Sequence, residues 1–321
     1  MTLGSPWHSA LNPAGPQAAH IARLTWVLLG STTIVLVIVL AFLGWAMVRG
    51  VRRRRQPSAD PPASEVSLTS SVAAGVVLTV LILIGLLTYS IWTDHLLTPV
   101  QASNAIAVAV TGHQWWWEIE YEDNVPSHRV TTANELHIPT GRPVVLTFKS
   151  ADVIHSFWAP SLHGKRDLIP GYTTTDWIQA DRPGLFRGQC AEFCGKQHAH
   201  MAFTVVAQSE AEFEHWLNGQ RALAQPPTTD HQQRGQQIFL AKTCSACHTV
   251  LGTAAHGHVG PDLTHVASRT SIAARTLTTS HQNLASWIQN SQAVKPGNHM
   301  PPHELSADDV DAVVAYLQSL Q

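Results

Sequence analysis

The densest group of potential metal ligands lies in the stretch "GQCAEFCGKQHAHM", residues 188–201. Cys190 and Cys194 are followed there by His198 and Met201. Thiolate, imidazole and thioether groups form a soft set that suits copper in an oxidising compartment. A disulfide between the two cysteines, or a zinc site, is the alternative chemistry for this loop.

A copper site in this loop needs a further ligand from elsewhere in the chain. A mononuclear blue-copper site uses one thiolate, whereas two thiolates can bridge two copper ions, each of which then needs an imidazole and a weak axial group. A pair of copper ions therefore requires a second histidine in addition to His198. His155, which follows the predicted strand "PVVLTFKS" (143–150), is the candidate.

The other two cysteines lie in "CSACH", residues 244–248. Cys244 and Cys247 have the spacing that attaches a c-type haem covalently, and His248 would then lie under the iron. A redox dithiol or half of a zinc site is the alternative. Both alternatives are weak, because no second Cys-x-x-Cys pair follows and no strand-helix context suggests a thioredoxin-like motif.

A sixth ligand to the haem iron is expected downstream, in "KPGNHMPP" (295–302). Met300 lies there between prolines, and a thioether axial ligand raises the potential of a c-type haem. His299 is the competing ligand. Met300 could instead fill a core, as most methionines do.

Two uncharged apolar runs, Val27–Val48 and Val72–Trp92, must anchor these sites. Each is long enough to cross about 30 Å of hydrocarbon as a helix. Charged residues make up only 13% of the chain, and the net charge of −2 gives no indication of nucleic-acid binding. Five arginines lie between the runs, in Arg49–Gln56, so the positive-inside rule places this loop in the cytoplasm and both chain ends outside.

The outer part of the chain changes its pattern near residue 210. Alternating apolar residues in 105–121, 135–150 and 200–208 predict short strands of a sandwich or barrel. The residues that follow predict helices, one opened by Ser209 and the last opened by Ser306. "QPPTTD" (225–230) reads as a linker between the two parts.

Three segments carry a resemblance to a known family. "VTGHQWWWEIEY" (110–121), "ADVIHSFWAPSLHGKRDLIPG" (151–171) and "RPGLFRGQCAEFCGKQHAHM" (182–201) closely resemble subunit II of the haem-copper cytochrome c oxidases. "VGPDLTHVASR" (259–269) resembles the class I cytochrome c segment whose proline, here Pro261, orients the haem histidine through its carbonyl. The chain therefore resembles an oxidase subunit II fused to a cytochrome c.

The resemblance implies a multidomain fold with defined boundaries. It implies an outer N-terminal segment (1–20), a transmembrane helical hairpin (21–95), an all-β cupredoxin Greek-key barrel (96–217), a linker (218–230) and an all-α class I cytochrome c domain (231–321). It also implies a dinuclear copper centre, called CuA. Its ligands would be the side chains of His155, Cys190, Cys194, His198 and Met201 and the backbone carbonyl of Glu192.

The same resemblance assigns roles beyond the copper ligands. The Glu192 carboxylate would help to bind Mg or Mn at the interface with subunit I, and Asp167 lies near that interface. Trp115 matches the aromatic residue through which electrons arrive in this family, and a core or rim residue is the equal alternative. Trp116 and Trp117 are expected to pack. His163 and His200 occupy no motif position. The Trp-Thr pair that often accompanies a proton path in this family is missing near Glu65, so no proton role is assigned there.

The expected function is that of an electron-transferring subunit of a proton-pumping terminal oxidase in the cell membrane. Electrons would pass from cytochrome c, or another external donor, to haem c, to CuA and then to haem in subunit I, where oxygen is reduced. Subunits I and III and membrane lipid are the expected partners. A CuA subunit of a nitric oxide reductase and a non-redox copper-binding membrane protein are the alternatives.

Overall fold

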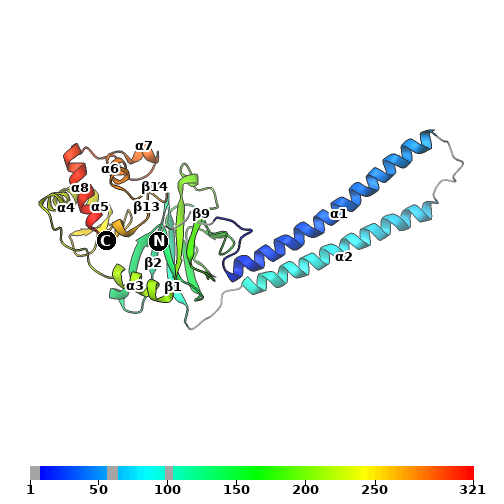
Figure 1. Cartoon of the computed structure of the whole chain (residues 1–321), viewed down its shortest axis with the longest axis horizontal. Helices are drawn as coiled ribbons and strands as arrows, with labels where there is room; N and C mark the ends of the chain where they lie inside the picture. The colour runs from blue at the N-terminus through cyan, green and yellow to red at the C-terminus, as the bar shows by residue number, and fades with distance from the viewer. Residues whose placement is uncertain (1–7, 56–63, 98–103) are drawn as a thin grey trace. The chain divides into compact units, whose positions relative to one another are not determined.

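The computed structural model describes residues 8–55, 64–97 and 104–321. The chain forms two units, a helical one (19–98) and a larger one that joins residues 1–18 to residues 99–321 (Figure 1).

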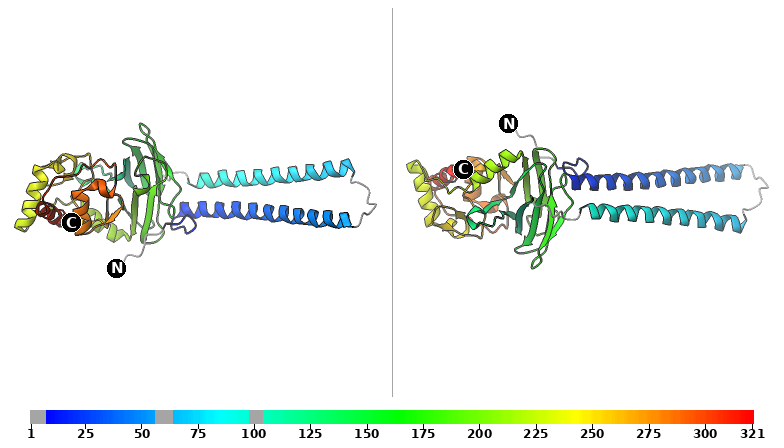
Figure 2. Two further views of the ribbon diagram at one scale, coloured as in Figure 1. Left: turned by 90° about the horizontal axis from the view of Figure 1, so that it is seen from above. Right: turned by 90° about the horizontal axis from the view of Figure 1, so that it is seen from below.

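The helical unit consists of two long helices, α1 (Pro16–Arg55) and α2 (Glu65–Leu97), which run without interruption (Figure 2). Each contains an 18-residue window of mean hydropathy 2.6 or 2.5 in which no residue is buried. Both apolar runs found in the sequence lie within these helices, which supports a membrane anchor. The prediction that the five arginines lie in a loop is wrong, because α1 extends through Arg55 and contains all five. Their positive charges are favourable at the carboxyl end of the helix.

A β-sandwich forms the first part of the larger unit. One sheet has the order β3-β2-β1-β5-β8 and the other β4-β10-β9-β6-β7. The pairs β1/β5 and β4/β10 are parallel and the other pairs are antiparallel. The predicted all-β cupredoxin fold is therefore confirmed. The strands are β1 (Ile106–His113), β2 (Trp116–Tyr121), β3 (Val130–Ala133), β4 (Glu135–Pro139), β5 (Val144–Ser150), β6 (His155–Trp158), β7 (Arg166–Leu168), β8 (Thr174–Ile178), β9 (Gly184–Cys190) and β10 (Ala202–Gln208).

Aromatic side chains fill the space between the two sheets. Trp117, as expected, is fully buried, and its ring meets those of Phe157 and Phe203 edge-on. Gly188 on β9 is required by this packing, because a Cβ there would lie 2.0 Å from Cζ of Phe203. The core thus supports β6, which begins at the predicted copper ligand His155, and β9, which ends at the predicted copper ligand Cys190.

Helix α3 (Glu210–Gln220) closes the sandwich. Ser209 caps it as predicted and forms a capping box with Glu212. Phe213 and Leu217 join the sandwich core. The helix continues to Gln220, three residues past the predicted end of the domain at 217.

The C-terminal part has a separate core built by helices, as predicted. Helix α4 (Asp230–Ala241) packs against α8 (Ala307–Ser319), whose apolar face Val310, Val313, Val314 and Leu317 is buried. The other helices are α5 (Cys244–Cys247), α6 (His281–Gln289) and α7 (Ser291–Val294). Two-residue strands β11 (Thr249–Val250), β12 (Ala255–His256), β13 (Ser271–Ile272) and β14 (Leu277–Thr278) connect them, together with the 3-10 turn η3 (Val266–Ser268). Two other 3-10 turns, η1 (Pro126–His128) and η2 (His198–His200), belong to the sandwich.

The residues before α1 pack on the sandwich, which the sequence did not indicate. The Ala14 amide donates to the carbonyl of Ser161 at 2.7 Å, and its carbonyl accepts from the amide of Asp181 at 2.7 Å. Gly15 permits this approach, because a Cβ there would lie 2.1 Å from the carbonyl oxygen of Gln179.

Polar contacts join the sandwich to the C-terminal part. The buried Glu135 carboxylate accepts hydrogen bonds from the amide and hydroxyl of Thr270, at 2.8 and 2.5 Å. Arg275 donates to the hydroxyl of Thr204. Because these partners lie on opposite sides of the linker, the two parts are held against each other rather than only tethered.

Candidate metal centres

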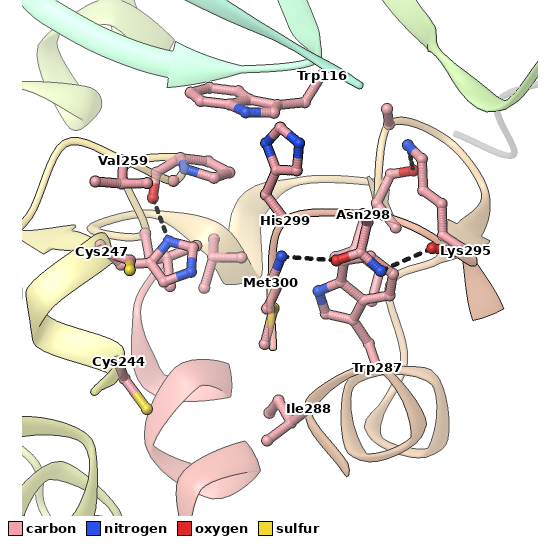
Figure 3. Close-up of a pocket in the computed structure, with 18 of the residues that line it drawn as sticks. Trp116, Cys244, Cys247, Val259, Trp287, Ile288, Lys295, Asn298, His299 and Met300 are labelled. Carbon is pink, nitrogen blue, oxygen red and sulfur yellow. Dashed lines mark hydrogen bonds between the residues drawn. The ribbon is translucent and has the colours of Figure 1, made fainter. Parts of the chain in front are cut away.

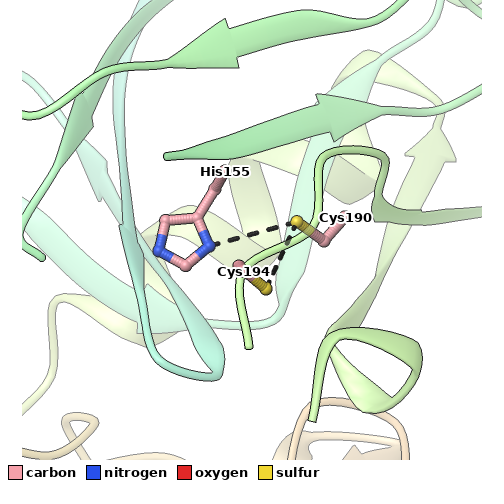
Figure 4. Close-up of side chains that lie close together, drawn as sticks. All are labelled: His155, Cys190 and Cys194. Atoms are coloured by element: carbon pink, nitrogen blue, oxygen red, sulfur yellow. Dashed lines mark hydrogen bonds between the residues drawn. The ribbon is translucent and has the colours of Figure 1, made fainter. Parts of the chain in front are cut away.

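The predicted copper ligands His155, Cys190 and Cys194 lie together in the sandwich (Figure 4). Their ligand atoms are all within 4.8 Å of one another and the three side chains are buried. The two sulfur atoms are 3.7 Å apart, and Sγ of Cys190 lies 4.0 Å from Nδ1 of His155. A disulfide needs about 2.05 Å between sulfurs, so this arrangement is that of two free thiols.

The other predicted ligands surround the same pair. Sγ of Cys194 lies 3.6 Å from Nδ1 of His198 and 3.8 Å from Sδ of Met201. The carbonyl oxygen of Glu192 lies 3.2 Å from Sγ of Cys190. The structure therefore brings all six together, one imidazole and one weak axial group beside each thiol, as a bridged pair of coppers requires.

A carboxylate that the sequence analysis missed orients His155. Nε2 of His155 lies 2.7 Å from Oδ1 of Asp152. When Nε2–H donates to Asp152, Nδ1 is left to bind a metal, which is the usual arrangement behind a metal-bound histidine. Burial lowers the pKa of His155, but hydrogen bonds with Cys190 and Asp152 outweigh burial and raise it.

The two thiols change each other's acidity. The hydrogen bond between them lowers the pKa of Cys190 to about 3, against the effect of burial and with help from His155. The same contact raises the pKa of Cys194. The pair therefore shares a proton, which a metal that binds both sulfurs displaces.

Trp115 lies directly beside this cluster. Its indole Nε1 donates to the carbonyl of Cys194 at 2.9 Å, and Nε2 of the Gln114 side chain donates to the same oxygen at 2.8 Å. On its other side, the ring of Trp115 faces that of His299, with 5.9 Å between ring centroids. The residue thus contacts both a predicted copper ligand and the loop of a predicted haem ligand. Trp116 packs as expected, stacked on His113, and it also lines the cavity described below.

The acidic residues predicted at the subunit I interface lie outside the copper cluster. Nζ of Lys165 is 3.0 Å from Glu192 and 3.1 Å from Asp167, and all three side chains are partly exposed. His163 and His200 bind elsewhere, as expected, with His163 3.3 Å from the Asp176 carboxylate and His200 2.7 Å from the Gln197 side chain.

The predicted haem attachment site lies at one side of an apolar cavity. Cys244 and Cys247 begin and end α5, and Nδ1 of His248 donates to the carbonyl of Pro261 at 2.7 Å. Burial lowers the pKa of His248, which favours the neutral imidazole. Nε2 is then free to bind iron. Gly260 allows the ring this position, because a Cβ there would lie 2.6 Å from its Cε1.

Met300 lies across the cavity from the two cysteines (Figure 3). Its amide donates to the side chain of Asn298 at 2.8 Å, and its carbonyl accepts from Ser291 at 2.7 Å and Gln292 at 3.0 Å. Three polar side chains therefore fix the backbone of this loop. The ring of His299, the competing ligand, faces Trp115 instead.

The residues around this cavity fit a haem. Ile288 and Trp287 supply apolar walls. Nε of Arg269 is buried and, among the residues that the structure describes, has no hydrogen-bond partner. A haem propionate would satisfy this guanidinium. The sequence analysis missed Asp152, Arg269 and the Asn298 side chain that accepts from the Met300 amide. Only the Asp152-x-x-His155 spacing offered a sequence signal.

Two known protein families match parts of this chain. Residues 125–208 match the periplasmic domain of cytochrome c oxidase subunit II, and residues 232–321 match cytochrome c. These families imply copper and haem c as cofactors. A solved structure, the periplasmic domain of cytochrome oxidase subunit II of Bradyrhizobium japonicum, matches 38% of this chain and 97% of its own, at 28% identity and a TM-score of 0.36.

Relatives match along almost the whole chain. Cytochrome c oxidase subunit 2 of Bacillus subtilis is 29% identical over 99% of this chain and 93% of its own. The corresponding protein of Alkalihalophilus pseudofirmus is 34% identical over 99% of this chain and 92% of its own. Identity at this level along both proteins shows that the chain belongs to the cytochrome c oxidase subunit II family, with a cytochrome c domain at its C-terminus.

Proposed function

We propose that this protein receives electrons for a haem-copper terminal oxidase and passes them, through its own haem c and dinuclear copper, to haem in subunit I. Oxygen would be reduced to water there, with proton pumping. The observation that carries the proposal is the position of Trp115, which contacts the copper-ligand residue Cys194 on one side and the haem-ligand loop at His299 on the other.

The side chains would divide the work as follows. Cys244 and Cys247 would hold the haem covalently, with His248 and Met300 as axial ligands. Bound haem and copper would each accept and release one electron. Rigid support of the ligands limits the rearrangement that accompanies each change of charge. The copper ligands would be His155, Cys190, Cys194, His198, Met201 and the Glu192 carbonyl.

The partners follow from the same proposal. Subunit I would take the electron from the copper side, and subunit III and lipid would surround the anchor. The Glu192 carboxylate, with Asp167 near it, is proposed to help bind Mg or Mn at the subunit I interface. Lys165 bridges the two carboxylates in this chain, so a divalent cation would have to displace it.

We propose that both chain ends lie outside the membrane, with the arginine-rich end of α1 in the cytoplasm. The packing of Ala14 on the sandwich supports this arrangement, because a chain that crosses twice returns to the side on which it began. The domain division 1–20, 21–95, 96–217, 218–230 and 231–321 is kept as part of the proposal, and the separate cores of the last two domains support it.

The experiment that tests this function uses the purified oxidase complex. Reduced cytochrome c is mixed rapidly with the oxidised complex, and the absorbance of haem c, copper and subunit I haem is followed over time. Reduction in the order haem c, copper, subunit I haem is expected. Reduction of the subunit I haem while haem c and copper remain oxidised would overturn the proposal. The family relation favours the oxidase over a nitric oxide reductase, which would instead consume nitric oxide.

A further inference from the structure

Lys295 is a buried lysine with an unusual set of partners. Its side chain is only 3% exposed. Nζ donates to three backbone carbonyls, those of Trp115 at 2.7 Å, His200 at 2.7 Å and Ala273 at 3.2 Å. In the part of the chain that the structure describes, no carboxylate lies within ion-pair distance of Nζ.

Such a group is costly to bury. A buried ammonium loses its hydration, and carbonyl dipoles replace only part of it. Burial lowers the pKa of Lys295 to about 7. A methionine or leucine of similar volume would avoid this cost, so packing alone does not explain a lysine here.

The partners of Lys295 lie at the junction of the two centres. Lys295 begins the loop that carries Met300, whereas Trp115 and His200 belong to the sandwich. His200 directly precedes Met201, and Trp115 contacts Cys194. One ammonium group therefore links the haem-ligand loop to both sides of the copper-ligand cluster.

A second contact joins the same two loops. The Gln197 side chain, between the copper ligands Cys194 and His198, donates to the carbonyl of Pro296 at 2.7 Å. Lys295 and Pro296 are thus both held by the copper-ligand loop. His299, further along the haem-ligand loop, faces Trp115.

We propose that Lys295 is a positioning residue that holds the Met300 loop against Trp115 and the copper-ligand loop, so that electron transfer between haem c and copper takes place within one docked unit. This inference rests on the proposed function. The step is a transfer of one electron from ferrous haem c, which becomes ferric, to the oxidised copper pair, which becomes singly reduced. No bond forms or breaks.

The test compares Lys295→Met with the parent in the haem- and copper-loaded oxidase complex. Methionine keeps the volume and removes the three donors. Haem c is reduced by a light pulse, and its reoxidation by copper is timed in buffers of rising glycerol content. A reaction that needs one conformation slows in proportion to the fraction of molecules in that conformation. If the docked state falls to about a tenth of the population in the variant, transfer should be about tenfold slower. We expect the variant rate also to fall as viscosity rises, while the parent rate does not change with viscosity.

A second measurement does not depend on activity. Hydrogen exchange is measured by mass spectrometry on the copper-free protein, in the copper-ligand loop (188–201) and in β1 and β2 with the turn between them that contains Trp115. Faster exchange is expected in Lys295→Met. The control is Lys242→Met, since Lys242 is an exposed lysine at the end of α4. The haem potential and copper spectrum of both variants should equal those of the parent.

The outcomes separate the two proposals. If Lys295→Met transfers at the parent rate with no dependence on viscosity, Lys295 does not position the loops, and the proposed function stands. If the parent itself shows no transfer from haem c to copper, the proposed function fails. If the variant is slow but its haem potential has also shifted, the effect lies in the iron ligands and the positioning role is rejected.

Discussion

The packing of α4 on α8 gives a sharp test, the substitution Gly235→Ala. A Cβ at residue 235 would lie 1.9 Å from the carbonyl oxygen of Ala312 and 2.9 Å from Cβ of Tyr316. Even a close carbon-to-oxygen contact needs about 3.3 Å. The two helices must therefore move apart by more than about 1 Å, and a backbone carbonyl cannot turn aside as a flexible side chain can.

Two effects of opposite sign decide the result. Alanine favours a helix over glycine by about 1 kcal/mol, whereas overpacking a core costs roughly 1 to 3 kcal/mol and sometimes more. The overlap here is against backbone, so the cost should lie at or above the upper end. We expect a net loss of about 2 kcal/mol in the free energy of unfolding of the cytochrome domain.

The assay is guanidinium unfolding of the purified, haem-loaded chain in detergent, followed by haem absorbance. Gly219→Ala in α3 is the matched control, because no atom lies within 4 Å of a Cβ at that position. It should be neutral or stabilising by up to about 1 kcal/mol. An unfolding midpoint for Gly235→Ala at or above that of the parent would refute the helix contact.

Three further predictions address the two centres and their junction. Asp152→Ala should weaken copper binding by about 10- to 100-fold with the haem spectrum unchanged. Asp152→Asn keeps an acceptor for His155 and should lose less affinity. If Asp152→Ala and the parent bind copper equally tightly in a competition titration with a chelator, the role of Asp152 is contradicted. Met300→Leu should lower the haem c potential and leave the copper spectrum intact, and an unchanged potential in a redox titration would show that another residue is the ligand. Glu135→Gln should lower the free energy of unfolding by roughly 1.5 to 3 kcal/mol, because the carboxylate accepts from Thr270. Burial raises the pKa of Glu135, but hydrogen bonds from His137 and Thr270 outweigh burial and lower it. This stabilisation should therefore be complete above about pH 4.3 and be lost as the pH falls through the lower folded-state pKa. Unfolding curves of the parent and Glu135→Gln at several pH values measure it. A difference between the two proteins that grows on acidification would contradict a stabilising role of the ionised Glu135.

The copper loop was accessible from sequence because its chemistry is local. Cys190, Cys194, His198 and Met201 lie within one short stretch, so any compact loop brings them together. The fifth side-chain ligand, His155, could be predicted only from the number of ligands that two coppers need and from the family resemblance. Its position becomes clear only in the sheet, where Phe157 of β6 is paired with Cys190 of β9.

The junction between the domains was not accessible from sequence. Lys295 meets Trp115 across 180 residues of chain, and no local pattern marks either residue as a partner of the other. The packing of residues 8–18 on the sandwich is hidden in the same way, because Ala14 and Gly15 act through their small size rather than through a recognisable pattern. Contacts of this kind depend on the assembled tertiary structure.

The most direct test of the central claim is the electron paramagnetic resonance spectrum of the purified, metal-loaded chain, recorded with its visible and near-infrared absorption. The assembled ligand set predicts hyperfine structure from one electron shared equally by two coppers, together with the bands of a covalently bound c-type haem. A signal from a single isolated type 1 copper, or a chain that binds no copper, would contradict it.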